Sequence, residues 1–301
     1  MTAASHNTPQ TEASVSKGIG ISFLGGLLLS FDVPLLKLSG ADTWTILYTR
    51  GTLLFIAMFL FWLFTNRLRH NNSPFINGKT GLLIACLAGI ANIMFVASIS
   101  LTSVANVVFL LALNPMFAGL LGWVFLKERL RKGTWIAIGV SMVGVAFIVA
   151  DGLHLGTWRG DLLALGVAII MAVSLTIIRH SRSDHSLSAA SGHLFAAILA
   201  APFASPASLT ATGWSWLALN GLIVAPAATA FLMVGPRYVA AAIVAMFFLL
   251  ETVLTPLWMW AIFSEHPSTN ALIGGAIVIA TLTIHSIWRL KSKQVALTVP
   301  D

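Results

Sequence analysis

Four ionisable side chains lie inside long apolar stretches of the sequence, well away from the polar residues that flank those stretches. They are Asp32, Arg50, His193 and Glu251. Within the hydrocarbon of a membrane such a group costs roughly 2.5–3.5 kcal/mol, so it either pairs inside the protein or belongs to the path of a solute or proton. These four residues are therefore the first candidates for chemistry.

Asp32 and Arg50 are expected to form an ion pair. With a rise of about 1.5 Å per helical residue, Asp32 lies roughly 21 Å along the first apolar run, and Arg50 lies at a similar depth in the second, which runs the opposite way. The pair is either a buried strut between two helices or a site for the ammonium and carboxylate of an amino acid. Pro34 cannot donate a backbone hydrogen bond and is expected to kink the helix beside Asp32.

Glu251 and His193 are candidates for moving a proton. Glu251 lies near the middle of the ninth apolar run, the depth at which transporters bind substrates and coupling ions. A functional carboxyl is favoured there over a hydrogen-bonded structural one. For His193, in the seventh run, a packing role is favoured over a proton relay.

Polar and aromatic side chains at helical spacing could complete a solute cavity. Asn106 and Asn114 are eight residues apart in the fourth run, which places them on nearly one face of a helix. Phe109 and Phe117 share that spacing, and alternating amide and aromatic surface suits an amphiphilic organic solute. The alternative is that each polar group only hydrogen-bonds between helices. Three further polar residues could line the same cavity: Asn92, Ser174 and Thr176.

The elements that position these residues are membrane-spanning helices. Of the 301 residues, 57% are hydrophobic and 9% are charged, whereas soluble domains are about 45–50% apolar and about 25% charged. The runs lack the strict alternation of a membrane β-barrel. We therefore predict an all-α integral membrane protein with ten transmembrane helices. Their expected positions are residues 18–38, 43–65, 80–99, 103–126, 133–150, 160–178, 187–204, 213–235, 238–263 and 269–290.

Basic residues set the expected orientation. The net charge is +7, with 17 Lys and Arg, and cytoplasmic loops of membrane proteins are rich in these residues. If the N- and C-termini are both cytoplasmic, Lys37 and Arg159 alone fall in outer loops. The charge thus indicates topology and not a nucleic-acid partner. We expect a disordered cytoplasmic tail at residues 1–16, a second tail at 291–301, and a multi-pass location in the plasma membrane (the inner membrane of a bacterium).

The sequence indicates no enzyme, cofactor or metal site. The single cysteine, Cys86, excludes an intrachain disulfide and a cysteine-based metal cluster. The His-Glu-x-x-His, Gly-x-Ser-x-Gly and phosphate-loop signatures are absent. The expected partners are a small-molecule substrate and the lipid bilayer, and the expected oligomeric state is a monomer.

The chain contains an internal repeat. Residues 114–128 align with residues 251–265 at a constant offset of 137. The matched pairs are Trp123 with Trp260 and Glu128 with Glu265. The halves, residues 17–152 and 153–290, each hold five predicted helices, and because five is odd the second half must be inverted in the membrane. Inverted repeats are typical of secondary transporters.

This arrangement resembles the drug/metabolite transporter superfamily in its EamA-type branch, over residues 17–290. In that branch each half has a proline on its fourth helix, a glutamate thirteen residues later and a glycine-containing fifth helix. The matching residues here are Pro115, Glu128, Gly139 and Gly144 in the first half and Glu265 and Gly275 in the second. Thr252 stands where the second proline would be, and the nearest proline is Pro256.

Within that branch the chain most resembles the YddG-type exporters of aromatic and other amino acids. The resemblance implies a secondary transporter that exports small amphiphilic metabolites, foremost amino acids including aromatic ones, by alternating access. Its midplane cavity would be lined by the first, third, fourth, sixth, eighth and ninth helices. Two alternatives stay open: an exporter of another solute class, such as a cationic drug or a nucleotide sugar, and a non-transporting membrane enzyme or scaffold, which is less favoured.

Overall fold

The structure, a computed structural model, describes residues 12–69, 75–126, 132–181, 186–234, 238 and 241–298. All regular secondary structure in these ranges is helical. The helices of the first half are α1 (Glu12–Leu29), α2 (Asp32–Leu38), α3 (Thr43–Arg69), α4 (Gly78–Leu101), α5 (Val104–Leu111), α6 (Asn114–Leu126) and α7 (Lys132–Leu155). Those of the second half are α8 (Trp158–Ser181), α9 (Ser186–Ala200), the short turns η1 (Ala201–Phe203) and η2 (Pro206–Ser208), α10 (Ala211–Ala218), the π-helix η3 (Leu219–Val224), α11 (Ala225–Val234), α12 (Ala241–Phe263) and α13 (Thr269–Thr298).

These helices are those of a multi-pass membrane protein. Seven helical segments of the described chain are long and apolar enough to cross a membrane, and three shorter apolar helices accompany them. Each of the ten predicted runs is mainly helical where the structure describes it, and the first and fourth are interrupted. The crossing of the membrane by all ten stays a prediction.

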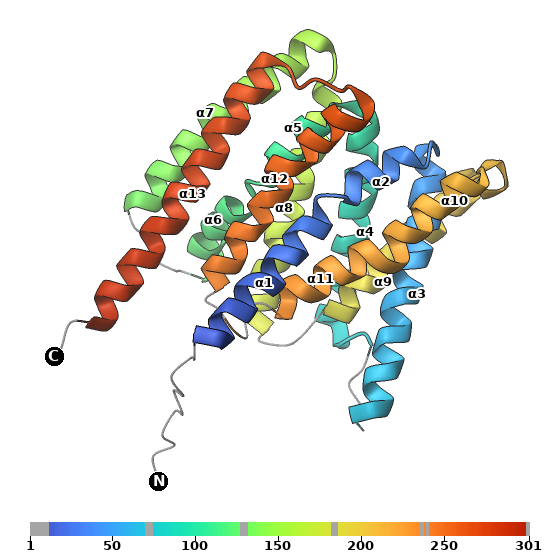
Figure 1. Cartoon of the computed structure of the whole chain (residues 1–301), viewed down its shortest axis with the longest axis horizontal. Coiled ribbons are helices and arrows are strands. Elements are labelled where there is room, and N and C mark those ends of the chain that lie inside the picture. Colours follow the sequence, from blue (N-terminus) through green and yellow to red (C-terminus); the bar gives the residue numbers. More distant parts are fainter. Residues whose placement is uncertain are drawn as a thin grey trace.

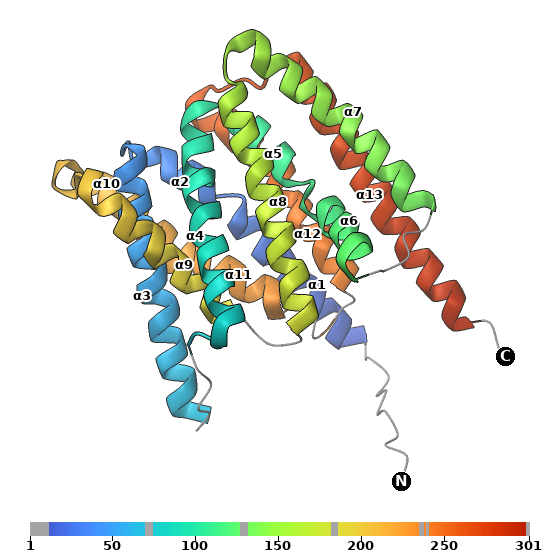
Figure 2. The same ribbon diagram turned by 180° about the vertical axis from the view of Figure 1, so that it is seen from behind.

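Two pairs of helices lie at opposite edges of the bundle, and the other helices pack between them. Helices α7 and α13 lie side by side along one edge (Figures 1 and 2), and at the other edge α3 packs against α9. Between these pairs, α1 packs against α11 and α12, while α8 packs against α4. The beginning of α1 and the last turns of α13 lie at one end of the bundle. The opposite end, where α2 ends and α3 begins, is called the Lys37 end below.

The first span is broken just before Asp32, as the proline predicts. Helix α1 ends at Leu29 and α2 begins at Asp32, because Pro34 has no N–H to bond the carbonyl of Ser30 four residues earlier. The hydroxyl of Thr255 donates to that carbonyl instead, at 3.0 Å. The indole Nε1 of Trp258 also donates to the Ser30 hydroxyl at 3.0 Å. Helix α12 therefore fixes the break that places Asp32 in the first turn of α2.

The fourth span is also divided, which corrects one prediction. A single helix carrying Asn106 and Asn114 on one face was expected, but α5 ends at Leu111 and α6 starts at Asn114. Pro115, the second residue of α6, lacks an N–H and its ring would clash with the carbonyl four residues back in a continuous helix, which favours the break before it. By contrast, α12 runs unbroken through Pro256.

Helix extends into both predicted tails. Helix α1 begins at Glu12 and α13 continues to Thr298, so residues 12–16 and 291–298 are helical rather than separate tails. Neither segment contains Gly or Pro, and the helix therefore has no reason to end there. Residues 1–11 and 299–301 lie outside the described residues.

The turn between α2 and α3 sets the register of Arg50. Gly40 leaves α2 with a φ of 64°, a left-handed conformation that favours glycine. The Asp42 carboxylate then caps α3, accepting from the backbone N–H of Trp44 at 2.9 Å and of Thr45 at 3.1 Å. Burial alone would raise the pKa of Asp42, but these bonds and one from the Thr45 hydroxyl lower it below its ordinary value.

Candidate functional site

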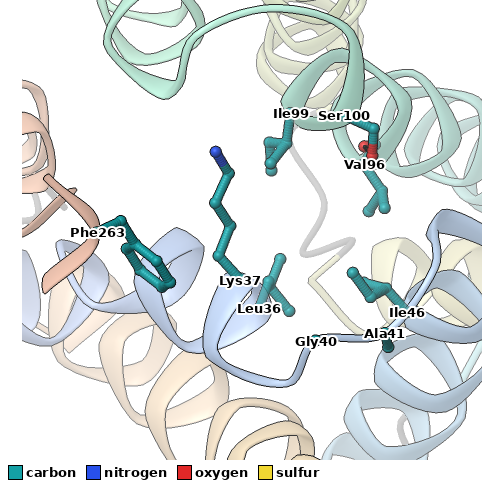
Figure 3. Close-up of a pocket in the computed structure, with 9 residues that line it drawn as sticks. All are labelled: Leu36, Lys37, Gly40, Ala41, Ile46, Val96, Ile99, Ser100 and Phe263. Carbon is teal, nitrogen blue, oxygen red and sulfur yellow. Dashed lines mark hydrogen bonds between the residues drawn. The ribbon is translucent and has the colours of Figure 1, made fainter. Parts of the chain in front are cut away.

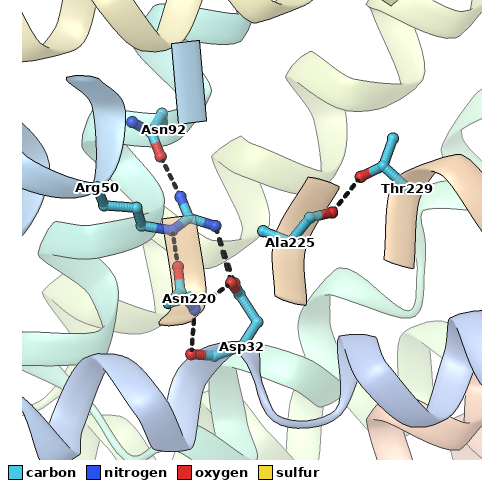
Figure 4. Close-up of polar contacts among 6 residues, drawn as sticks. All are labelled: Asp32, Arg50, Asn92, Asn220, Ala225 and Thr229. Atoms are coloured by element: carbon cyan, nitrogen blue, oxygen red, sulfur yellow. Dashed lines mark hydrogen bonds and ion pairs between the residues drawn. The ribbon is translucent and has the colours of Figure 1, made fainter. Parts of the chain in front are cut away.

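A buried polar network surrounds Arg50 on α3 (Figure 4). Its Nη2 donates to both carboxylate oxygens of Asp32, at 2.9 and 3.1 Å. Its Nη1 donates to Oδ1 of Asn92 at 2.7 Å, and its Nε donates to Oδ1 of Asn220 at 3.2 Å. The ion pair expected from the depths of Asp32 and Arg50 is thus present, and Asn92 belongs to the same group. Each guanidinium nitrogen donates at least one hydrogen bond.

Asn220 is the member of the network that the sequence reading missed. Its Nδ2 donates to the backbone oxygen of Asp32 at 3.0 Å and to the Asp32 carboxylate at 2.8 Å, and its side chain is fully buried. It lies in η3, and π-helical turns are frequent at functional sites. An amide in the middle of the eighth apolar run was a signal that could have drawn attention to it.

The network joins the two halves of the chain. Asp32, Arg50 and Asn92 come from α2, α3 and α4, whereas Asn220 comes from the second half. The exposed fractions of these four residues are 6% or less. Removing an ion pair from water is tolerated only when its remaining donors and acceptors are satisfied, and the two asparagines supply those bonds here.

Three buried polar atoms around this network have no partner among the described residues: Nδ2 of Asn92, Oγ1 of Thr49 and Nδ1 of His193. Thr49 adjoins Arg50 in α3. The backbone of His193 on α9 packs directly against Gly51, the residue on the other side of Arg50. Such atoms are rare in proteins, and a water or a solute usually bonds them.

Glu251 on α12 lies within electrostatic reach of the network. The charges of Asp32 and Arg50 both act on Glu251, and both also act on His193. The Glu251 side chain is partly exposed. It makes no hydrogen bond or ion pair with the part of the chain that the structure describes. Glu251 is therefore an unbonded carboxyl within electrostatic range of the Asp32–Arg50 pair.

Asn106 belongs to a different cluster. Its Nδ2 donates to the Asp161 carboxylate at 3.0 Å, and the Thr102 hydroxyl donates to the same oxygen at 2.7 Å. This cluster ties the beginning of α5 to the beginning of α8, so Asn106 does not join Asn92 as expected. The reason is the path of α5, which packs against α8 and carries Asn106 in its first turn.

The remaining candidates make no hydrogen bond to the network within the described residues. Ser174 and Thr176 donate to carbonyls of their own helix, at 2.9 and 2.8 Å. The ring of Phe109 packs on Gly275 of α13, and Phe117 packs against the apolar core. Asn114 starts α6, with its buried Oδ1 unbonded by any described residue. Among the described residues no group of three His, Cys, Asp or Glu could hold a metal ion.

The comparison with protein families settles the class of the protein. The EamA-like transporter family matches the chain twice, over residues 16–150 and 158–287. The chain belongs to the EamA-like transporter family. It is therefore a multi-pass membrane transporter of small solutes, from a family of transporters rather than enzymes.

Solved structures give this EamA-like transporter the same fold. Sixteen chains of known structure match it. One of them, a crystal structure, is 15% identical, covers 91% of this chain and 98% of its own, and has a TM-score of 0.64. No curated protein matches the chain.

Proposed function

We propose that this protein exports small amphiphilic metabolites, foremost amino acids including aromatic ones, by alternating access across the plasma membrane. The observation that carries the proposal is the buried network of Asp32, Arg50, Asn92 and Asn220, which lies at the junction of the two halves. In secondary transporters the substrate site lies at such a junction, near the middle of the membrane.

The chemistry of the group around the network suits a zwitterion. The unbonded Nδ2 donors of Asn92 and the second N–H of Nη1 of Arg50 can donate to a solute carboxylate. The unbonded carboxyl of Glu251 can receive the solute ammonium. The ring of Phe95 lies 5.7 Å from the guanidinium of Arg50, and it offers an aromatic surface to an apolar side chain. His193, whose backbone packs against Gly51 next to Arg50, carries an unbonded ring nitrogen that could also contact the solute.

The pairing of helices supports two inverted five-helix repeats and ten crossings, with both termini cytoplasmic. Helix α7 packs on α13 and α3 packs on α9, each pair being the same position in the two halves. The contact of α1 with α11 is matched by that of α8 with α4. In this scheme the halves rock against each other around the network, so that the site opens first to one side and then to the other.

Uptake of labelled amino acids into proteoliposomes tests the proposed substrate class. Labelled Phe and Thr should enter vesicles containing the protein faster than empty vesicles. Unlabelled amino acids should compete with them, whereas an uncharged sugar should not. Equal entry into filled and empty vesicles for every amino acid tested would refute the substrate class while leaving the family assignment intact.

A cationic drug is the second candidate solute, and the unbonded carboxyl of Glu251 favours it. A cation-binding site in a membrane needs an unpaired carboxylate facing the solute. If the protein exports a cationic drug, cells that express it should resist the drug and Glu251→Gln should abolish the resistance. If amino-acid flux is present and drug resistance is absent, this second candidate fails.

A further inference from the structure

A pocket of about 370 Å³ opens at the Lys37 end, between α2, α3, α4 and α12 (Figure 3). Its floor is formed by Leu36, Ile46 and Val96, whose exposed fractions are 1, 7 and 2%. Ile99 and Phe263 form apolar walls. A volume of this size lies at the lower end of the range for small-molecule sites, about 300–1,000 Å³.

The residues that form the floor of the pocket also cover the buried network. Leu36 follows Asp32 by one helical turn, and Val96 follows Asn92 by one turn. Ile46 precedes Arg50 by one turn on α3, which runs the other way. All three apolar residues therefore lie about 6 Å nearer the Lys37 end than the polar residues that they cover. One layer of side chains separates the pocket from the network.

Lys37 gives the pocket a charge at its rim. The side chain points into the open space between Phe263 and Ile99 (Figure 3). Its ammonium donates to Oε2 of Glu265 at 2.7 Å, and no other described residue accepts from it. An ammonium has three donors, so two of them have no acceptor among the described residues.

The Glu265 carboxylate would keep a second hydrogen bond if Lys37 paired with another carboxylate. Its second oxygen, Oε1, accepts from the backbone N–H of Val104 at 2.9 Å. That N–H belongs to the first turn of α5, where a negative charge is favourable. A carboxylate that approaches Lys37 therefore replaces one half-exposed ion pair by another, while Glu265 stays bonded to α5.

We propose that this pocket binds a small amphiphile through its carboxylate, which pairs with Lys37, while its apolar part lies against Ile99, Phe263 and the floor. The proposal rests on the proposed function, because the ligand is taken to be the transported solute on its way to or from the network. It adds a second site, which recognises one end of the solute, to the buried one.

The proposal can be tested, without measuring flux, by the binding of three small molecules that share a phenylpropyl skeleton. The purified protein in lipid nanodiscs is titrated with phenylpropionate, phenylpropanol and phenylpropylamine, which differ in charge at one end. The carboxylate should bind most tightly and the amine most weakly. Lys37→Gln should weaken carboxylate binding about five- to tenfold, the effect of losing one partly solvated charged hydrogen bond, and should leave the alcohol unchanged.

Two further variants separate this site from general effects. Lys79→Gln removes an exposed lysine from the opposite end of α4 and should bind all three probes as the parent does. Ala41→Phe puts a large side chain into the pocket while keeping the Lys37 ammonium, and should weaken all three probes together. Equal binding of the three probes by the parent protein, or unchanged binding by both Lys37→Gln and Ala41→Phe, overturns the proposal. Amino-acid flux with no such binding would leave the proposed function standing, whereas binding without any flux would refute the proposed function and keep the pocket.

Discussion

At the scale of residues, the central question is whether the Asp32–Arg50 pair holds the fold or also binds solute. All three guanidinium nitrogens of Arg50 are bonded to protein groups, which is what a strut requires. Unbonded polar atoms on Asn92 and His193 lie beside the same group, which is what a solute site requires. Both roles are compatible, and they respond differently to mutation.

Removing the charge of Arg50 alone should destabilise the protein strongly. Arg50→Gln leaves the buried carboxylate of Asp32 without its cation, and breaking one side of a buried pair costs about 3–5 kcal/mol. The double variant Asp32→Asn with Arg50→Gln removes both charges and should regain at least half of that loss. Thermal unfolding of the purified protein in detergent measures both changes. Amino-acid flux should stay lost in the double variant. Recovery of flux would show that the ion pair has a structural role only.

Glu251 should behave in the opposite way, affecting flux more than stability. Because no described residue bonds its carboxyl, Glu251→Gln should unfold within about 2 °C of the parent protein. Initial uptake of labelled Phe should fall about tenfold, since the solute ammonium loses a charged partner. Where a pH gradient drives uptake by the parent protein, that dependence should disappear in the variant. An unchanged uptake rate would exclude Glu251 from the path.

At the scale of elements, breaks in helices place the site. Pro34 ends α1 early and leaves the Ser30 carbonyl to Thr255 on α12, so the turn that carries Asp32 is held by the second half of the chain. Pro115 divides α5 from α6 in the same way, and Asn106 on α5 bonds Asp161 instead of the network. A proline predicts a break in each case, but Thr255, which bonds the carbonyl freed by Pro34, lies far away in the sequence.

Close helix packing gives a second prediction at this scale. A Cβ added at Gly144 of α7 would lie 2.7 Å from the backbone oxygen of Gly274 on α13, whereas one added at Gly139 meets nothing within 4 Å. Gly144→Ala should therefore destabilise the protein by about 1–3 kcal/mol. Gly139→Ala lies on the same helix and should be neutral, or stabilising by about 0.5–1 kcal/mol, because alanine favours helix. Thermal unfolding compares the two, and equal shifts would contradict the tight α7–α13 crossing.

At the scale of the whole molecule, the two ends of the bundle should face opposite sides of the membrane. Ser208 is an exposed residue in the segment whose Ser205 bonds Thr45 near the start of α3, which places it near the Lys37 end. Lys79 is exposed at the start of α4, at the other end. The excess of Lys and Arg on one side predicts that the Lys37 end faces outward.

Labelling of single cysteines measures this orientation. In a Cys86→Ser background, Ser208→Cys should react with a membrane-impermeant thiol reagent on intact cells. Lys79→Cys should react only after the cells are permeabilised. The reverse pattern would invert the topology, and reaction of both positions on intact cells would refute the span assignment between them.

The sequence by itself determined the class of protein, the positions of the helices and the nearness of Asp32 to Arg50. Each of these depends on local or one-dimensional properties, such as the length of an apolar run, a proline within it, or the depth of a charge along a helix of known rise. The family and its two copies in the chain follow from the same pattern.

The tertiary structure alone decided which polar groups meet. Arg50 bonds Asn220 across 170 residues of sequence, through a π-helical turn that hydrophobicity does not reveal. Asn106 and Asn114, eight residues apart, lie in two separate helices, and Asn106 bonds Asp161 on α8 rather than the network. Side-chain bonds between distant helices depend on how the helices cross and rotate, and those angles are fixed by the packing of the whole bundle rather than by any one segment.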